Sequence, residues 1–284
     1  MTEHGAKFIL TLSCPDRPGI VHAVSALIAT NGGNIIQSQQ FGDPDTGLFF
    51  MRVELESPRG RAPIEAGLVD FGKNFEARWD LDEMGRALRT IIMVSREGHC
   101  LTDLLYRQRY QDLPIEVVAV VGNHPDLAPV AQFYGKPFLC IPVTKDNKTQ
   151  AERELLDLVR AEDIELIVLA RYMQILSDAL CQELAGRIIN IHHSFLPSFK
   201  GARPYAQAHD RGVKLIGATA HYVTADLDEG PIIEQDVTRV THRESTRDLV
   251  AEGQDVERRV LAQAVKWHSE HRVLMNGDRT VVFN

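Results

Sequence analysis

The segment from Ile188 to Pro197 reads Ile-Ile-Asn-Ile-His-His-Ser-Phe-Leu-Pro. Its apolar residues predict a strand that carries an amide and an imidazole at its end. Further along, Leu227–Pro231 is a Leu-Asp-Glu-Gly-Pro turn that carries one acid. Strand ends can bring such groups together. Asn190 would donate an N–H to a developing oxyanion, and His192 would donate and accept protons near neutral pH. Asp228 would orient or deprotonate water, so the trio predicts hydrolysis or transfer of an acyl group.

Strands and helices alternate on both sides of this segment. Apolar strands are predicted at Thr90–Val94, Ile115–Val121, Phe138–Ile141, Leu166–Leu169 and Ile188–Ile191. Helical patterns lie between them at Cys100–Arg109, Leu127–Tyr134, Thr149–Ala161 and Asp178–Leu184. Near-continuous apolar strands separated by helices are typical of a parallel sheet that is covered on both faces.

The pattern changes after Ile191. Strands at Lys214–Thr224 and Ile232–Val240 predict a hairpin added to the sheet, and Thr246–Ser269 predicts a last helix with Ser245 as its cap. We therefore expect residues 86–284 to form a Rossmann-like, doubly wound α/β domain with a mostly parallel sheet.

The N-terminal residues predict a different domain. Strands are expected at Lys7–Ser13, Asn34–Phe41, Leu48–Glu56 and Glu76–Leu81, with helices from Asp16 to Gly33 and over Ala62–Asn74. In the first helix, Asp16 is expected near the cap and Pro18 in the first turn. The order strand-helix-strand-strand-helix-strand is that of a ferredoxin-like α+β domain. The polar segment Asp82–Arg89 places the boundary, so this domain should cover residues 1–85.

Composition narrows the class of protein. A chain of 284 residues with 44% hydrophobic and 25% charged residues suits two globular domains. No apolar run approaches the roughly 18 residues of a membrane span, and the N-terminus has no secretory pattern, so we expect a cytoplasmic protein without a membrane partner. A net charge of -8 without a basic block argues against a nucleic-acid partner.

Cysteine and histidine spacing argue against a metal site. The four cysteines lie far apart, which suggests neither a disulfide framework nor a zinc ribbon. His192, His193, His209 and His221 could be imagined as ligands, but no His-x-x-x-His pair occurs. We therefore expect no catalytic metal.

The run from Ile188 to Val237 resembles the folate-dependent formyltransferase family, whose catalytic residues are an Asn-x-His pair and a later Asp. Ser194–Gly201 and Gly217–Val223 match this family as well. The resemblance implies that Asn190, His192 and Asp228 are catalytic. Burial is expected to raise the pKa of Asp228.

The resemblance also implies a pterin pocket. In the family, the loop that corresponds to Leu169–Leu176 lines this pocket, with the Val223–Asp228 loop as the opposite wall. Met173 and Ile175 could instead be core residues at a helix edge. Arg203 is expected to line the cleft together with His193. The predicted substrate-binding residues are Arg171, Met173, Ile175, Leu176, His193 and Val223.

One loop bears on the formyl acceptor. Nucleotide-acceptor members of the family carry a glycine-serine-rich loop that cradles a phosphate, whereas Ser95–Cys100 has one glycine, and Glu97 would repel a phosphate. The resemblance then implies hydrolysis of 10-formyltetrahydrofolate by water, which supplies formate for purine synthesis and balances the one-carbon pool. No cofactor is expected, because the folate is the substrate. A formyltransferase with a small amine acceptor and a non-catalytic folate or amino-acid sensor remain alternatives.

Residues 7–82 resemble ACT domains, small modules that bind amino acids and pair edge to edge. The resemblance implies a regulatory, oligomerisation domain in a homo-oligomer, either a dimer or a tetramer. An amino-acid effector such as glycine is expected to bind near Asp16, Gly19, Ile20 and Asn34.

Overall fold

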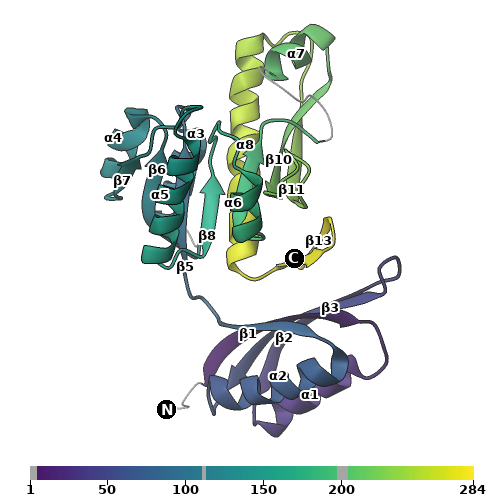
Figure 1. Ribbon diagram of the computed structural model, residues 1–284. Coiled ribbons are helices and arrows are strands. Elements are labelled where there is room, and N and C mark those ends of the chain that lie inside the picture. Colours follow the sequence, from purple (N-terminus) through teal and green to yellow (C-terminus); the bar gives the residue numbers. More distant parts are fainter. Residues whose placement is uncertain (1–4, 111–112, 197–203) are drawn as a thin grey trace. The chain divides into compact units, whose positions relative to one another are not determined.

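The computed structural model describes residues 5–110, 113–196 and 204–284 (Figure 1). These residues fall into two compact units. One contains the N-terminal segment up to Arg86 together with Glu270–Asn284, and the other is Ala87–Ser269. Among the described residues, no helix has both the length and the apolar character needed to cross a membrane.

The first unit contains a four-stranded antiparallel sheet in the order β2-β3-β1-β4. Its elements are β1 (Ala6–Pro15), α1 (Ile20–Thr30), β2 (Asn34–Asp43), β3 (Leu48–Ser57), α2 (Arg61–Phe75) and β4 (Arg78–Glu83). Both helices cover the same face of the sheet (Figure 1). Alternate residues of β1, such as Leu10 and Leu12, pack there against Val24 and Leu68, because successive strand residues point to opposite faces. The predicted ferredoxin-like α+β order is confirmed.

The predicted start of the first helix is wrong. The helix begins at Ile20, and its N-cap is Gly19, with φ 95° and no side-chain cap. Asp16 lies before it, and its backbone N–H donates to the carbonyl of Gly47 at 2.9 Å. The reason is local: Pro18 disfavours helical backbone at Arg17, and only a glycine takes the left-handed conformation without strain.

The last 15 residues, Glu270–Asn284, differ from the predicted assignment to the second domain, because their contacts group them with the first unit. They form a hairpin of β12 (Val273–Asn276) and β13 (Arg279–Val282). The buried Arg52 donates to the carbonyls of Glu270 and His271. Asn276 donates to the Asp43 carboxylate at 2.6 Å. These polar contacts lie far apart in the chain, and no local pattern announces them.

The second unit contains a seven-stranded sheet in the order β11-β10-β9-β8-β5-β6-β7. The strands are β5 (Leu88–Val94), β6 (Ile115–Gly122), β7 (Phe138–Cys140), β8 (Leu166–Leu169), β9 (Ile188–His192), β10 (Leu215–Tyr222) and β11 (Ile232–Arg239). Strands β5 to β9 run parallel, β10 pairs antiparallel with β9, and β11 pairs antiparallel with β10. The predicted mostly parallel sheet with an added hairpin is confirmed.

Helices cover both faces of this sheet. They are α3 (His99–Tyr110), η1 (Pro125–Leu127), α4 (Ala128–Phe133), α5 (Lys148–Ala161), α6 (Asp178–Glu183), α7 (Pro204–Arg211) and α8 (Thr246–Ser269). Side chains of α5 and α6 pack with Ile91 and Met93 of β5 in one core layer. Ile92 and Val94 are also fully buried but point to the other face. The long helix α8 packs against β9, β10, β11 and α3.

Helices α8 and α7 differ in how well the sequence predicts them. The capping of α8 is as expected, because Ser245 and Asp248 exchange hydrogen bonds between each backbone N–H and the other side chain. Helix α7 was not predicted. Its eight residues lack a recurrent apolar stripe, and two of them, Tyr205 and Ala208, are buried in a small core with Leu249 of α8.

Candidate active site

The candidate residues lie at the carboxyl ends of strands β8 and β9 and in the turn between β10 and β11. Asn190 and His192 are among the last three residues of β9, and the loop after β8 begins at Ala170. In doubly wound sheets, the carboxyl ends of the strands are where ligands bind. Because β10 pairs antiparallel with β9, His221 lies directly opposite Asn190.

The turn between β10 and β11 supplies the carboxylate. Asp228 has φ 56°, a left-handed conformation that Asp tolerates better than most residues. Gly230 has no room for a side chain, since a Cβ there would collide with the Tyr222 carbonyl. This close turn brings Asp228 Oδ2 to 3.2 Å from His192 Nδ1 and Oδ1 to 3.7 Å from His221 Nε2. The structure thus brings together the three residues that the sequence predicted as catalytic.

The expected pKa shift of Asp228 is wrong in direction. The hydrogen bond with His192, followed by the interaction with His221, lowers the pKa of Asp228 well below its ordinary range and outweighs the effect of burial. The carboxylate is therefore ionised at neutral pH. A strongly acidic Asp is a poor acceptor of a whole proton, but it is a strong acceptor of the His192 Nδ1–H.

The orientation of Asn190 follows from its neighbour. His221 Nδ1 lies 2.9 Å from the Tyr222 carbonyl, which can only accept, so Nδ1 carries the hydrogen. When the ring carries only this hydrogen, Nε2 accepts from Asn190 Nδ2 at 3.2 Å; when Nε2 is also protonated, it faces Asp228 Oδ1 at 3.7 Å. This contact fixes the amide with its nitrogen toward His221 and leaves a second N–H of Asn190 for another acceptor.

A cavity of about 250 Å³ adjoins these residues. Its walls are Leu169, Arg171–Leu176, Cys181, Asn190–His193, His221 and Val223–Asp228. His192 is buried, and its Nε2 has no hydrogen-bond partner among the residues that the structure describes. Buried polar atoms without a partner are uncommon and favour a ligand or functional role.

The predicted substrate-binding residues all line this cavity. Met173 and Ile175 are 58% and 61% exposed, so they are wall residues rather than the core residues of the alternative interpretation. Leu176 is buried and belongs to the core layer as well as to the wall. Arg203 and the segment from Pro197 to Gly201 lie outside the described residues.

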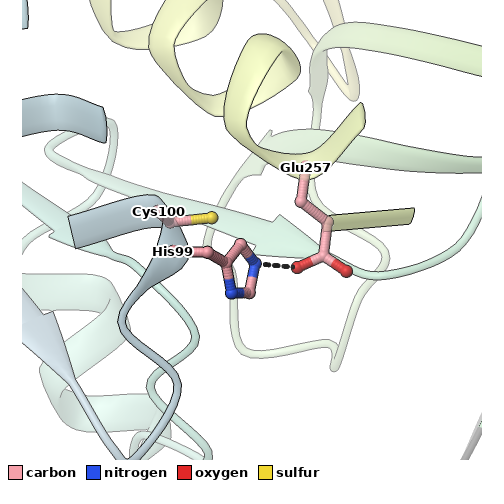
Figure 2. Close-up of side chains that lie close together, drawn as sticks. All are labelled: His99, Cys100 and Glu257. Atoms are coloured by element: carbon pink, nitrogen blue, oxygen red, sulfur yellow. Dashed lines mark hydrogen bonds and ion pairs between the residues drawn. The ribbon is translucent and has the colours of Figure 1, made fainter. Parts of the chain in front are cut away.

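Sequence reasoning missed a second polar cluster beside the cavity. Glu257 of α8 has no exposed surface, and it accepts from Tyr205 Oη at 2.5 Å and pairs with His99 Nε2 at 2.8 Å (Figure 2). Arg171 Nε lies 3.5 Å from the same carboxylate, and its guanidinium also pairs with Glu97 at 3.2 Å. An acid inside the apolar stripe of α8 was the available signal. The pairing with Arg171 also weakens the predicted repulsion of a phosphate by Glu97.

His221 was considered in the sequence only as a metal ligand. Its partnership with Asn190 depends on the register of β10 against β9, which no local pattern reports. The strand Gly217–Val223 was noted as a match to the family, but without that register its histidine could not be assigned to the amide.

The expected amino-acid site divides into two places. Asp16, Gly19 and Ile20 lie at the start of α1, whereas Asn34 opens β2 after the end of that helix. A helix of 11 residues spans about 16 Å. A single small ligand in one subunit therefore does not span both groups.

Comparison with known proteins defines the class first. The model of the formyl transferase family matches residues 88–265, and the ACT domain model matches residues 8–66. The chain therefore carries an ACT domain followed by a formyl transferase domain, as the sequence predicted.

Relatives over the full length define the family more narrowly. A formyltetrahydrofolate deformylase of Corynebacterium sp. (strain P-1) is 49% identical over 97% of this chain and 98% of its own. The crystal structure of a formyltetrahydrofolate deformylase from Burkholderia mallei has a TM-score of 0.94 and 47% identity, covering 98% of this chain and 100% of the other. The chain belongs to the formyltetrahydrofolate deformylase family.

A more distant neighbour covers a smaller part of the chain. The glycinamide ribonucleotide transformylase 1 structure from Symbiobacterium toebii has a TM-score of 0.66 and 28% identity, covering 71% of this chain and 97% of the other. The chain is thus similar both to structures named deformylase and to a structure named transformylase.

Proposed function

We propose that this chain hydrolyses 10-formyltetrahydrofolate to tetrahydrofolate and formate. One observation carries the proposal: a buried His192 is held by an ionised Asp228 on one ring nitrogen, while the other nitrogen lacks a partner among the described residues. That nitrogen belongs to a residue of the cavity wall, as does Asn190. An oriented base beside an amide donor is the arrangement that acyl hydrolysis requires.

The cavity walls suit a flat heteroaromatic ring. Met173 and Ile175 on one loop and Val223 on the other present apolar surface, while backbone groups of the same loops can bind the polar ring edge. We assign this wall to the pterin. The formyl group would then lie at the polar end of the cavity, beside Asn190, His192 and Asp228.

The first chemical step is attack by water. Asp228 holds Nδ1–H of His192, so Nε2 is the basic nitrogen and takes a proton from water as the water oxygen bonds to the formyl carbon. Asp228 stays ionised and stabilises the imidazolium that forms, which fits its lowered pKa. This assigns the water proton to His192 rather than to Asp228.

The tetrahedral oxyanion is stabilised by Asn190. The contact with His221 fixes its amide, so one N–H remains for the oxyanion without reorganisation. Collapse of the intermediate breaks the bond between the formyl carbon and N10. His192 Nε2–H returns the proton to N10, and formate and tetrahydrofolate leave without a cofactor.

A formate assay tests this proposal. Purified protein with 10-formyltetrahydrofolate and no added amine should release formate and tetrahydrofolate in equal amounts. If formate appeared only after a primary amine was added, the chain would be a transferase. If the folate bound but never turned over, the chain would be a sensor.

We also propose a regulatory role for the ACT unit in a cytoplasmic homo-oligomer, where the formate supplies purine synthesis. Two copies would bring Asp16–Ile20 of one α1 to Asn34 of the other and enclose an amino acid such as glycine. A ligand that binds catalytic conformers unequally shifts their populations. Sedimentation and melting temperature, each with and without glycine, test this role. A monomer that no amino acid stabilises would contradict it.

A further inference from the structure

Both carboxylate oxygens of Glu257 have hydrogen-bond partners, whereas Nη1 of Arg171, in the same cluster, is buried without one among the described residues. Tyr205 Oη donates to Oε1, and His99 Nε2 pairs with Oε2, the contact that Figure 2 shows. The Arg171 guanidinium lies 3.5 Å from Oε2. Burial opposes ionisation of Glu257, but the His99 hydrogen bond, the Arg171 charge and the Tyr205 hydroxyl together lower its pKa. Glu257 is therefore an ionised carboxylate fixed in the protein interior.

A metal ion does not suit this cluster. Ligand atoms of His99, Cys100 and Glu257 lie within 4.8 Å of one another, as a metal site would require. Burial, however, raises the pKa of the Cys100 thiol well above its ordinary value, and thiolate is the form that binds metal. A cation on Glu257 would also lie beside the Arg171 guanidinium. The cluster fits a hydrogen-bonded wall better than a metal site.

Arg171 is the member of the cluster that lines the cavity. Its backbone has φ 64°, the left-handed conformation, which costs a non-glycine residue roughly 1–2 kcal/mol. Its side chain is 8% exposed and is clamped by Glu97 and Glu257. A glycine would adopt this backbone without strain, so Arg171→Gly removes the guanidinium without straining the loop.

The cluster lies directly behind the proposed base. The ring of His193 stacks on that of His192 at 5.1 Å between centroids, and it lies 6.4 Å from the ring of Tyr205. Burial and then the Arg171 charge lower the pKa of His193 to about 4, so this ring is neutral at neutral pH. A neutral ring backed by fixed charges fills the space on this side of His192.

We propose that Arg171, clamped by Glu97 and Glu257, is a specificity-determining residue that keeps amine acceptors away from the formyl carbon and leaves room for water. Arg171 lines the same cavity as Asn190, His192 and Asp228, so its bulk limits the room beside the reacting carbon. Glu257 is fully buried, so its ion pair holds the guanidinium in place, while the half-exposed Glu97 pairs with it from the other side. The inference rests on the proposed hydrolysis and adds to it the reason why water is the nucleophile.

The chemistry of a misdirected reaction is simple. A neutral primary amine would form a bond from its nitrogen to the formyl carbon, and the bond from that carbon to N10 would break. The proton lost by the amine would pass through His192 to N10. The products would be a formamide and tetrahydrofolate, without any oxidant or reductant.

Product partition tests the inference. Wild-type protein, Arg171→Gly and Arg171→Lys are incubated with 10-formyltetrahydrofolate and glycinamide, the amine part named for the more distant transformylase, and formate and formylglycinamide are quantified. Arg160→Ala, which removes an exposed arginine on α5, is the matched control. We expect formate alone from wild type and control, and at least a tenfold higher ratio of formylglycinamide to formate from Arg171→Gly. Arg171→Lys, which keeps the charge but not the planar fork, should lie between them.

Two further results sharpen the test. Added guanidinium ion should fill the space left in Arg171→Gly and restore formate as the main product. Formylglycinamide from the wild type, or an unchanged ratio in folded Arg171→Gly, would overturn the role of Arg171 while leaving hydrolysis intact. Absence of formate from the wild type would instead contradict the proposed function.

Discussion

Glu257 and Asp228, two carboxylates of the second unit, are both ionised but differ in their burial and in their partners. Glu257 is fully buried, and three protein donors contact its oxygens. Asp228 is 19% exposed, and the imidazole that it holds leaves one buried nitrogen without a partner among the described residues. Glu257 holds the Arg171 guanidinium in the wall of the cavity, whereas Asp228 orients the His192 imidazole. Burial, charge and an unpaired atom do not by themselves distinguish the two clusters, because Nη1 of Arg171 also lacks a partner among the described residues. What differs is that Asp228 holds an imidazole, a group that can exchange a proton near neutral pH, whereas Glu257 holds a guanidinium that cannot.

The largest expected effect comes from Asp228→Asn. An asparagine amide can donate to Nδ1 and so favours the tautomer with its hydrogen on Nε2, which cannot take a proton from water. We expect turnover to fall by about three to four orders of magnitude, with folate affinity within about tenfold. Single-turnover kinetics and equilibrium binding measure the two. Asp210→Asn, on the exposed end of α7, serves as the control, and near-normal turnover of Asp228→Asn would refute the mechanism.

Asn190→Ala should have the next largest effect. It removes the donor that His221 orients, and loss of one oxyanion donor costs about two to three orders of magnitude in kcat. KM should change little, because the interaction develops in the transition state. A rise in KM at constant kcat would make Asn190 a ground-state binding residue instead.

Protonation of His193 should make stability depend on pH. Its pKa is about 4 in the folded protein and near 6.5 when exposed, so the unfolded chain binds the extra proton as the pH falls through this window. Stability is therefore full above about pH 6.5 and is lost progressively toward pH 4. Between about pH 7.5 and pH 5, wild type should lose about 2 kcal/mol more than His193→Gln in denaturant unfolding. Parallel losses in the two proteins would show that His193 is not the titrating group.

The smallest effect contrasts two neighbours in the loop after β8. Ile175→Ala should raise KM about fivefold without changing kcat, because an exposed wall residue contributes uniform binding, and stability should change by less than about 0.5 kcal/mol. Leu176→Ala should destabilise the fold by about 2 kcal/mol or more, since Leu176 lies in the core layer. Equal destabilisation by the two substitutions would place Ile175 in the core rather than in the pocket.

Local patterns predicted much of this molecule. The apolar runs of β5, β6, β8 and β9 and the spacing in α8 follow directly from side-chain periodicity, and Asn190, His192 and Asp228 were found as motifs. The first turn of α1 was misplaced because a left-handed Gly19 follows Pro18. Helix α7 and the C-terminal hairpin escaped prediction because distant contacts, such as that of Asn276 with Asp43, hold them.

The partners of the proposed catalytic residues were harder to predict than the residues themselves. His221 meets Asn190 only through strand register, and Glu257 meets Arg171 across many intervening elements. The pKa of Asp228 was predicted in the wrong direction because burial was considered without the two imidazoles that face the carboxylate. Electrostatic environment depends on tertiary neighbours, which a sequence does not list.

Isotope labelling of the product tests the central claim that water attacks the formyl carbon. Turnover in heavy-oxygen water, with no amine present, should give formate with at least one oxygen from solvent in every molecule, together with an equal amount of tetrahydrofolate. Mass spectrometry of the formate reads the label directly. Unlabelled formate, or no formate at all until an amine is supplied, would contradict the account.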